Sequence, residues 1–189
     1  MVRSSLSAWK LDIPTLPSGL TLAVGLALGA SVIVPAFAAG GGGDPPPPPT
    51  CAKGQVYNAK KNSCVKAERG VLPDEELTQY AYALAKEDRF QEALNLLDML
   101  ENPNTPKALN YRGFATRKLG RTDEGIGYYL KSVTLDPNYA QVREYLGEAY
   151  VIQGKVDLAK SQLATIKTIC GTGCEEYEDL AQAIEDAEL

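Results

Sequence analysis

Small residues recur at fixed intervals between residues 74 and 169, and this repeat limits the possible fold more than any other feature of the sequence. A first set shows intervals of 32 and 34 residues: Ala81, Gly113 and Gly147. A second set shows the same two intervals: Ala93, Gly125 and Ala159. Because two independent sets agree on one period, we interpret the region as a tandem repeat, with small residues at the points where helices cross.

Apolar residues within each repeat are spaced three and four positions apart, which predicts amphipathic helices with one stripe facing a core. The first repeat carries Leu77, Tyr80, Ala81, Leu84, Ala93, Leu96, Leu97 and Leu100. The second carries Leu109, Gly113, Thr116, Leu119, Ile126, Tyr129, Leu130 and Val133, and the third Leu146, Gly147, Tyr150, Ala159, Leu163 and Ile166. Helix-breaking residues divide each repeat in two: Asp88-Arg89, Gly120 and Gly154. Others separate the repeats: Pro103, Pro106 and Asp136-Pro137-Asn138. The sequence therefore predicts consecutive helical hairpins.

A period near 34 residues built from paired helices is typical of tetratricopeptide repeat (TPR) proteins, and residues 74 to about 169 resemble this family. The matching positions are Leu146-Gly147, Tyr150, Gly154, Ala159, Tyr129 and Asp136-Pro137. Departures occur at Leu77, Leu109 and Arg143 in place of a large aromatic, at Gly125 in place of alanine, and at Asp88 in place of a loop glycine. The resemblance implies an all-α, right-handed solenoid with repeats at 74–105, 106–139 and 140–173.

Residues 174–189 are predicted to form a capping helix for this solenoid. Its apolar face carries Tyr177, Leu180, Ala181 and Ile184, and its first turns carry Glu175, Glu176, Glu178 and Asp179. Acidic side chains suit the positive end of a helix dipole. They lack the glycine and the alternating ligands of a calcium-binding EF-hand, so we interpret them as a solvated face and expect no metal site.

The resemblance also implies that the first helix of each pair lines a concave groove. The predicted groove residues are Thr78, Tyr82, Lys86, Asn110, Phe114, Arg117, Lys118, Glu144 and Glu148. We expect Tyr82 and Phe114 to be exposed beside Arg117 and to form a hot spot for a protein or peptide partner. The alternative is that Phe114 packs against a neighbouring helix.

The carboxylate clamp that the family uses to hold a chain-terminal carboxylate is not reproduced. Lys107, Asn110 and Arg117 lie in the middle repeat, but the third repeat offers Gln141, Glu144 and Glu148 where cations are needed. We therefore expect a groove that is positive in its middle and negative toward its C-terminal end. Such a groove suits a partner segment of mixed charge. We also expect that replacing Phe114 and Arg117 together abolishes partner capture without unfolding the protein.

Residues 1–38 have the order of a secretory signal peptide. Arg3 and Lys10 precede the apolar run Leu20 to Val34, and Ala36-Phe37-Ala38 supplies a small-residue cleavage site. Cleavage is predicted after Ala38, giving a periplasmic or secreted bacterial protein without a stable membrane span. The alternative is an uncleaved anchor, although an apolar run of about 15 residues is short for a span that needs about 20.

The segment after the predicted cleavage site contains a linker and a small closed hairpin. Residues 39–50 combine Gly40–Gly43 with Pro45–Pro49, which predicts a spacer, or alternatively a polyproline docking segment. Residues 51–66 contain the β-prone Gln55-Val56-Tyr57 between two cysteines and predict a disulfide-closed hairpin. A sugar-binding role for Tyr57 is the alternative to a capping role.

The four cysteines are Cys51, Cys64, Cys170 and Cys174. An even number in an exported chain suggests two disulfides, and of the three possible pairings sequence proximity favours Cys51 with Cys64 and Cys170 with Cys174. Cys170 and Cys174 could instead form a redox-active pair, although the C-x-x-x-C spacing differs from the usual C-x-x-C.

Composition excludes several classes of function. The chain has no histidine, which excludes Ser/His/Asp triads and histidine-zinc enzymes. Its net charge of −5, without a dense basic stripe, argues against nucleic-acid binding. We expect no enzyme activity and no cofactor. The predicted function is an adaptor or scaffold for protein complexes of the cell envelope. The alternatives are a thiol-disulfide protein using Cys170 and Cys174, and a cell-wall or carbohydrate-binding protein using the Cys51–Cys64 hairpin.

Overall fold

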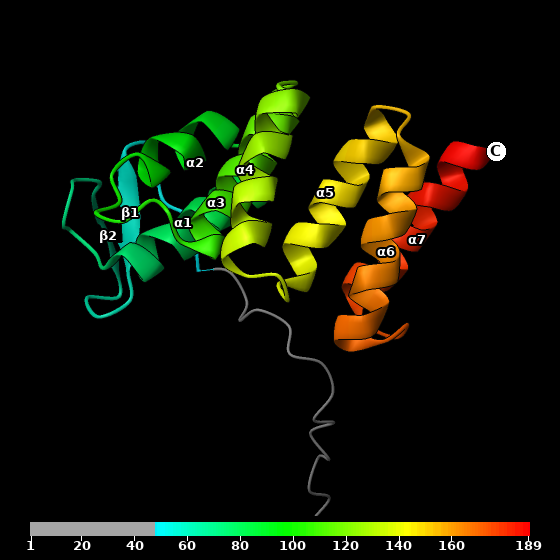
Figure 1. Cartoon of the computed structure of the whole chain (residues 1–189). Helices are drawn as coiled ribbons and strands as arrows, with labels where there is room; N and C mark the ends of the chain where they lie inside the picture. Colours follow the sequence, from blue (N-terminus) through cyan, green and yellow to red (C-terminus); the bar gives the residue numbers. More distant parts are fainter. Residues whose placement is uncertain (1–47) are drawn as a thin grey trace, which may run out of the picture. The chain divides into compact units, whose positions relative to one another are not determined.

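The computed structural model describes residues 48–189 as one small β-hairpin followed by paired helices (Figure 1). The strands are β1 (Gln55–Asn58) and β2 (Ser63–Lys66), and the helices are α1 (Asp74–Lys86), α2 (Phe90–Leu97), α3 (Pro106–Lys118), α4 (Thr122–Leu135), α5 (Ala140–Ile152), α6 (Val156–Cys170) and α7 (Glu175–Glu188). The predicted signal peptide and residues 39–47 of the predicted linker lie outside the described residues. Within 48–189, no helix has the length and apolar character to span a membrane.

The N-terminal hairpin packs against the first repeat. Its strands are antiparallel, with Val56 opposite Val65, and the Cys51–Cys64 disulfide closes it. Val56 is fully buried in the main hydrophobic core. The Cys51 amide donates a hydrogen bond to the Tyr80 hydroxyl, and Arg89 Nη1 donates to the Cys51 carbonyl at 2.8 Å. The hairpin therefore contributes to the core at the start of the solenoid, as a capping element does.

Backbone chemistry explains where the helices of the middle repeat begin and turn. Thr105 Oγ1 accepts a hydrogen bond from the Ala108 amide at 3.2 Å, and Pro106 occupies the first turn of α3. This is a side-chain N-cap followed by a residue that lacks an amide hydrogen where none is needed. Gly120, with a φ of +84°, ends α3, the first helix of the middle repeat. Asp88 takes the equivalent left-handed conformation, with a φ of 60°, in the first repeat. Aspartate is one of the few residues that tolerate it, which explains how the repeat turns without its loop glycine.

The small residues of the middle repeat lie where its two helices cross. A Cβ atom added at Gly113 would meet the Tyr129 ring at 2.5 Å, and one added at Gly125 would meet the Gly113 carbonyl at 2.9 Å. In the third repeat, a Cβ atom at Gly147 would instead meet Leu180 of α7 at 2.5 Å. The same repeat position therefore allows α3 and α4 to approach each other in the middle repeat, and allows α7 to pack against α5 in the third repeat.

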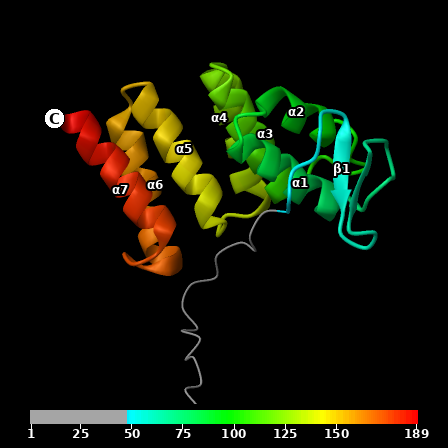
Figure 2. The same ribbon diagram turned by 180° about the vertical axis from the view of Figure 1, so that it is seen from behind.

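Two hydrophobic clusters hold the described region together. The larger extends from Val56 in the hairpin to Leu146 in α5. The smaller joins α6 and α7 through Ala159, Ile166, Leu180 and Ile184, and these two helices lie beside α5 in both views (Figures 1 and 2). The C-terminal helix therefore buries its apolar face on the last repeat, as predicted for a cap.

Two predicted core residues of the middle repeat are exposed. Leu119 is 41% exposed because it lies at the C-cap of α3, beyond the last turn that packs on α4. Leu130 is 46% exposed because it follows Tyr129, which takes the core position. Adjacent residues on a helix point about 100° apart. The periodicity therefore identified α4 correctly, but it included Leu130, which lies next to the buried stripe of that helix.

Candidate functional site

Aromatic side chains of three successive first helices pack together on the predicted groove face. We call Tyr82, Tyr111, Phe114 and Tyr145 the aromatic cluster. Tyr82 stacks on Tyr111 with ring centroids 4.2 Å apart, and the Phe114 ring lies 5.0 Å from the Tyr145 ring. The hydroxyls of Tyr82 and Tyr145 are hydrogen-bonded at 3.1 Å, which joins α1 to α5 across α3. The cluster is therefore a connection between all three repeats.

The expected exposure of Phe114 is wrong. Its side chain belongs to the core, with only 7% of the residue exposed, and packs against rings from α1 and α5. The alternative interpretation, packing against neighbouring helices, is the correct one. Tyr82 is partly buried, whereas Lys86 and Lys118 are exposed, with their ammonium groups 5.9 Å from the Tyr82 ring and 5.5 Å from the Phe114 ring. These lysines place positive charge at the edge of the cluster.

Arg117 is also part of the folded structure rather than a free cation. Its Nη2 lies 2.5 Å from Glu148 Oε2, and its Nε donates a hydrogen bond to the Tyr129 hydroxyl at 3.3 Å. The residue is 7% exposed and connects α3, α4 and α5. Joint replacement of Phe114 and Arg117 is therefore expected to unfold the repeats, which corrects the expectation that it would leave the fold intact.

The polar candidates of the first two repeats are likewise used within the fold. Thr78 and Asn110 are buried. Asn110 Nδ2 donates to the Tyr139 hydroxyl at 3.1 Å and to Gln141 Oε1 at 2.9 Å, so it ties α3 to the start of α5. Lys107 Nζ lies 3.1 Å from Glu75 Oε1. The residues that resemble half of a carboxylate clamp are thus engaged by neighbouring helices.

The C-terminal end of the predicted groove face is acidic. Glu144 on α5 is buried, and the acids of the first turns of α7 face it. Burial, followed by the like charges of Glu148, Asp179, Glu176 and Glu175, raises the pKa of the Glu144 carboxyl to about 9. Glu144 is therefore neutral at pH 7. We call these five residues the acidic cluster. The contribution of α7 was not predicted, because its acids were assigned to a solvated face.

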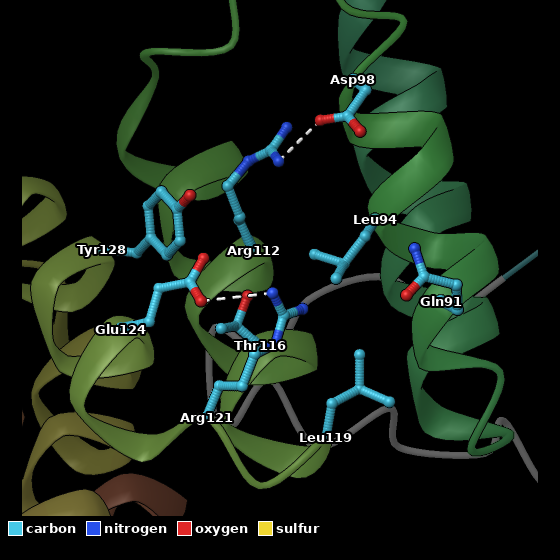
Figure 3. Close-up of a pocket in the computed structure, with 9 residues that line it drawn as sticks. All are labelled: Gln91, Leu94, Asp98, Arg112, Thr116, Leu119, Arg121, Glu124 and Tyr128. Carbon is cyan, nitrogen blue, oxygen red and sulfur yellow. Dashed lines mark hydrogen bonds and ion pairs between the residues drawn. The ribbon is translucent and has the colours of Figure 1, made fainter.

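A pocket lies between α2 and the α3–α4 pair (Figure 3). It has a volume of about 430 Å³ and is lined by Gln91, Leu94, Asp98, Arg112, Thr116, Leu119, Arg121, Glu124 and Tyr128. Arg112 pairs with Asp98 at 2.7 Å, and Arg121 pairs with Glu124 at 3.2 Å. Because both cations have carboxylate partners within the lining, the pocket offers no free charge for a small ligand. Its residues come from three helices, so no sequence motif could have indicated it.

The Cys170–Cys174 disulfide connects the end of α6 to the N-cap of α7. Both this pairing and Cys51–Cys64 are the ones that sequence proximity favours. The sulfur atoms and a carboxylate oxygen of Glu176 lie within 4.8 Å of one another. Metals bind the thiolate form of cysteine, so this oxidised pair offers a link between helices rather than a ligand set.

Comparison with known proteins supports the fold. No protein-family model matches the chain, and no curated protein matches it in sequence. The type III secretion translocator chaperone SycD of Yersinia enterocolitica matches with a TM-score of 0.51 at 15% identity, over 61% of this chain and 87% of SycD. The first TPR domain of human RPAP3 matches with a TM-score of 0.50 at 18% identity, over 61% of this chain and 94% of that domain. The chain therefore has the fold of tetratricopeptide repeat proteins, as the repeat pattern predicted.

Proposed function

We propose that this protein is a non-enzymatic adaptor or scaffold that binds a segment of another protein along the face formed by its first helices. The observation that carries the proposal is the opposite charge on two parts of that face. Lys86 and Lys118 are exposed beside the aromatic cluster, and the acidic cluster lies at the α5–α7 end. By its description, SycD is a chaperone of translocator proteins, and a protein-handling role of this kind is consistent with the proposal.

The lysine end of this face can be tested without disturbing the core. We expect the full-length protein, immobilised and exposed to envelope extract, to retain a partner in a fixed ratio. The double variant Lys86→Glu/Lys118→Glu should retain about tenfold less, because it reverses two exposed charges next to the aromatic rings. Lys60→Glu/Lys61→Glu in the exposed turn of the hairpin is the matched control. Equal retention by all three proteins would contradict the proposed face.

We also infer that the protein works outside the cytoplasm. The signal-peptide pattern of residues 1–38 and the presence of two disulfides support the same location, because disulfides persist in oxidising compartments. N-terminal sequencing of the exported protein should begin at Ala39. A protein that still begins at Met1 would show that the segment is an anchor instead.

A further inference from the structure

Glu144 is a buried carboxyl group surrounded by other carboxyl groups. It is 6% exposed and lies on α5, one helical turn before Glu148. Glu175, Glu176 and Asp179 reach it electrostatically from the N-terminal part of α7. Burying an acid next to like charges opposes its ionisation and costs stability when it is ionised. Core packing alone does not require an acid here.

The Glu144 carboxyl has no hydrogen-bond donor and no ion-pair partner among the described residues. Arg117 of α3 reaches the cluster, but its guanidinium is paired with Glu148 at 2.5 Å. Helix α7 contains no lysine or arginine. The acidic cluster therefore has one internal cation, and Glu144 and the three acids of α7 remain for an external one.

The arrangement favours an extended cation over a bare metal ion. Within residues 48–189, the ligand oxygens of these acids do not come together as a compact group of three that could enclose an ion. Glu175 and Asp179 are exposed and Glu176 is partly exposed, so a partner can approach the cluster from the side of α7. A long side chain with a charged end can place that end among acids while its stem stays on apolar surface.

We propose that the acidic cluster binds a lysine or arginine side chain of the partner segment, with Glu144 as the innermost acceptor. This inference rests on the proposed adaptor function, because the occupant is a segment of another protein. Charge complementarity selects a basic segment over an acidic one. The cluster thereby differs from a carboxylate clamp, whose cations hold an acidic chain end.

Binding should release a proton. Glu144 is neutral at pH 7 in the free protein, and a bound cation favours its charged form. The proton therefore leaves as the ammonium or guanidinium group arrives, and binding tightens as the pH rises from 6 to 8. Glu148 and the α7 acids add attraction that salt screens.

The test uses the full-length protein and a peptide of repeated Gly-Ser-Lys units, with an Nε-acetyl-lysine version as control. We expect the lysine peptide to bind roughly tenfold more tightly than the acetylated one. Calorimetry in buffers of different ionisation enthalpy should show release of up to about one proton. Glu144→Gln, which mimics the neutral resting acid and should fold normally, should abolish the proton release and weaken binding. Glu185→Gln, at an exposed position on α7, should do neither.

Equal binding of the acetylated peptide, absence of binding, or proton release that persists in Glu144→Gln would each overturn the inference. Displacement of the peptide by an equivalent of Ca²⁺ would assign the cluster to a metal ion and overturn it as well. These failures are distinct from failure of the adaptor function. A protein that retains its partner through Lys86 and Lys118 but ignores the lysine peptide would refute only the basic-segment site.

Discussion

Addition of one methyl group to a glycine should have opposite effects at two positions of the middle repeat. At Gly127 on α4, an added Cβ atom meets nothing within 4 Å. Alanine is favoured over glycine inside a helix by about 0.5–1 kcal/mol, so Gly127→Ala should stabilise the protein by that amount. At Gly113 on α3, the same atom would lie 2.5 Å from the Tyr129 ring and 3.0 Å from the Gly125 carbonyl oxygen. The ring is fully buried and its hydroxyl is held by Arg117, so it cannot turn aside.

The expected loss at Gly113 follows from these distances. Overpacking of a core typically costs about 1–3 kcal/mol, and the close backbone oxygen places this site near the upper value. After subtraction of the helix gain, Gly113→Ala should destabilise by about 2 kcal/mol. Its thermal midpoint should fall by roughly 4–8 °C, while that of Gly127→Ala should rise by roughly 1–4 °C. Urea unfolding would measure both. Equal stability of the two variants would show that α3 and α4 do not cross at Gly113.

Three further predictions address the links between repeats and the acidic cluster. Arg117→Met should lower the free energy of unfolding by about 2–4 kcal/mol, because it leaves Glu148 without its buried partner. In urea titrations, Arg117→Met/Glu148→Leu should recover at least half of that loss. No recovery would contradict the ion-pair explanation. Loss of the Cys170–Cys174 disulfide should cost about 2 kcal/mol of stability and loss of Cys51–Cys64 about 3 kcal/mol, since the bonded residues are 4 and 13 positions apart. Hydrogen exchange in α7 should become faster when Cys170–Cys174 is lost but not when Cys51–Cys64 is lost. Equally faster exchange throughout the protein would argue against a local link. The raised pKa of Glu144 means that the folded state binds its proton more tightly than the unfolded state. Stability should therefore fall as the pH rises from 5 to 9, by at most about 1.4 kcal/mol per pH unit. Glu144→Gln should flatten the thermal midpoint over this pH range, and an unchanged slope would assign the pH dependence to other groups.

The repeat architecture could be predicted from sequence because its signals are local. The spacing of Ala81, Gly113 and Gly147 reflects contacts that need close approach of helices, and only small residues permit that approach. The disulfide pairing could also be predicted from local sequence, because each pair of cysteines closes a short segment. A single helical period also revealed the apolar face of α7.

The state of the groove face could not be predicted, because it depends on contacts between repeats. Tyr82 and Tyr145 are 63 residues apart, yet their hydroxyls are hydrogen-bonded. A helical pattern shows which residues share one side of a helix. It does not show that α1 and α5 approach each other across α3 and enclose Phe114. Arg117 and Glu148 were predicted as a positive and a negative part of a groove, and in the fold they neutralise each other.

The contacts between repeats limit which side chains of the face can bind a partner. Phe114 and Arg117 hold neighbouring repeats together, so neither side chain is free to anchor a ligand. In the proposed function, recognition then depends on the charged groups that remain on two parts of the face: the lysines of α1 and α3, and the acidic cluster of α5 and α7. Because these two parts carry opposite charge, a segment with an acidic part and a basic part can satisfy both in one direction only. In the reversed direction, like charges would meet in both parts and oppose binding. Charge polarity, rather than an aromatic hot spot, would therefore set the orientation of the partner.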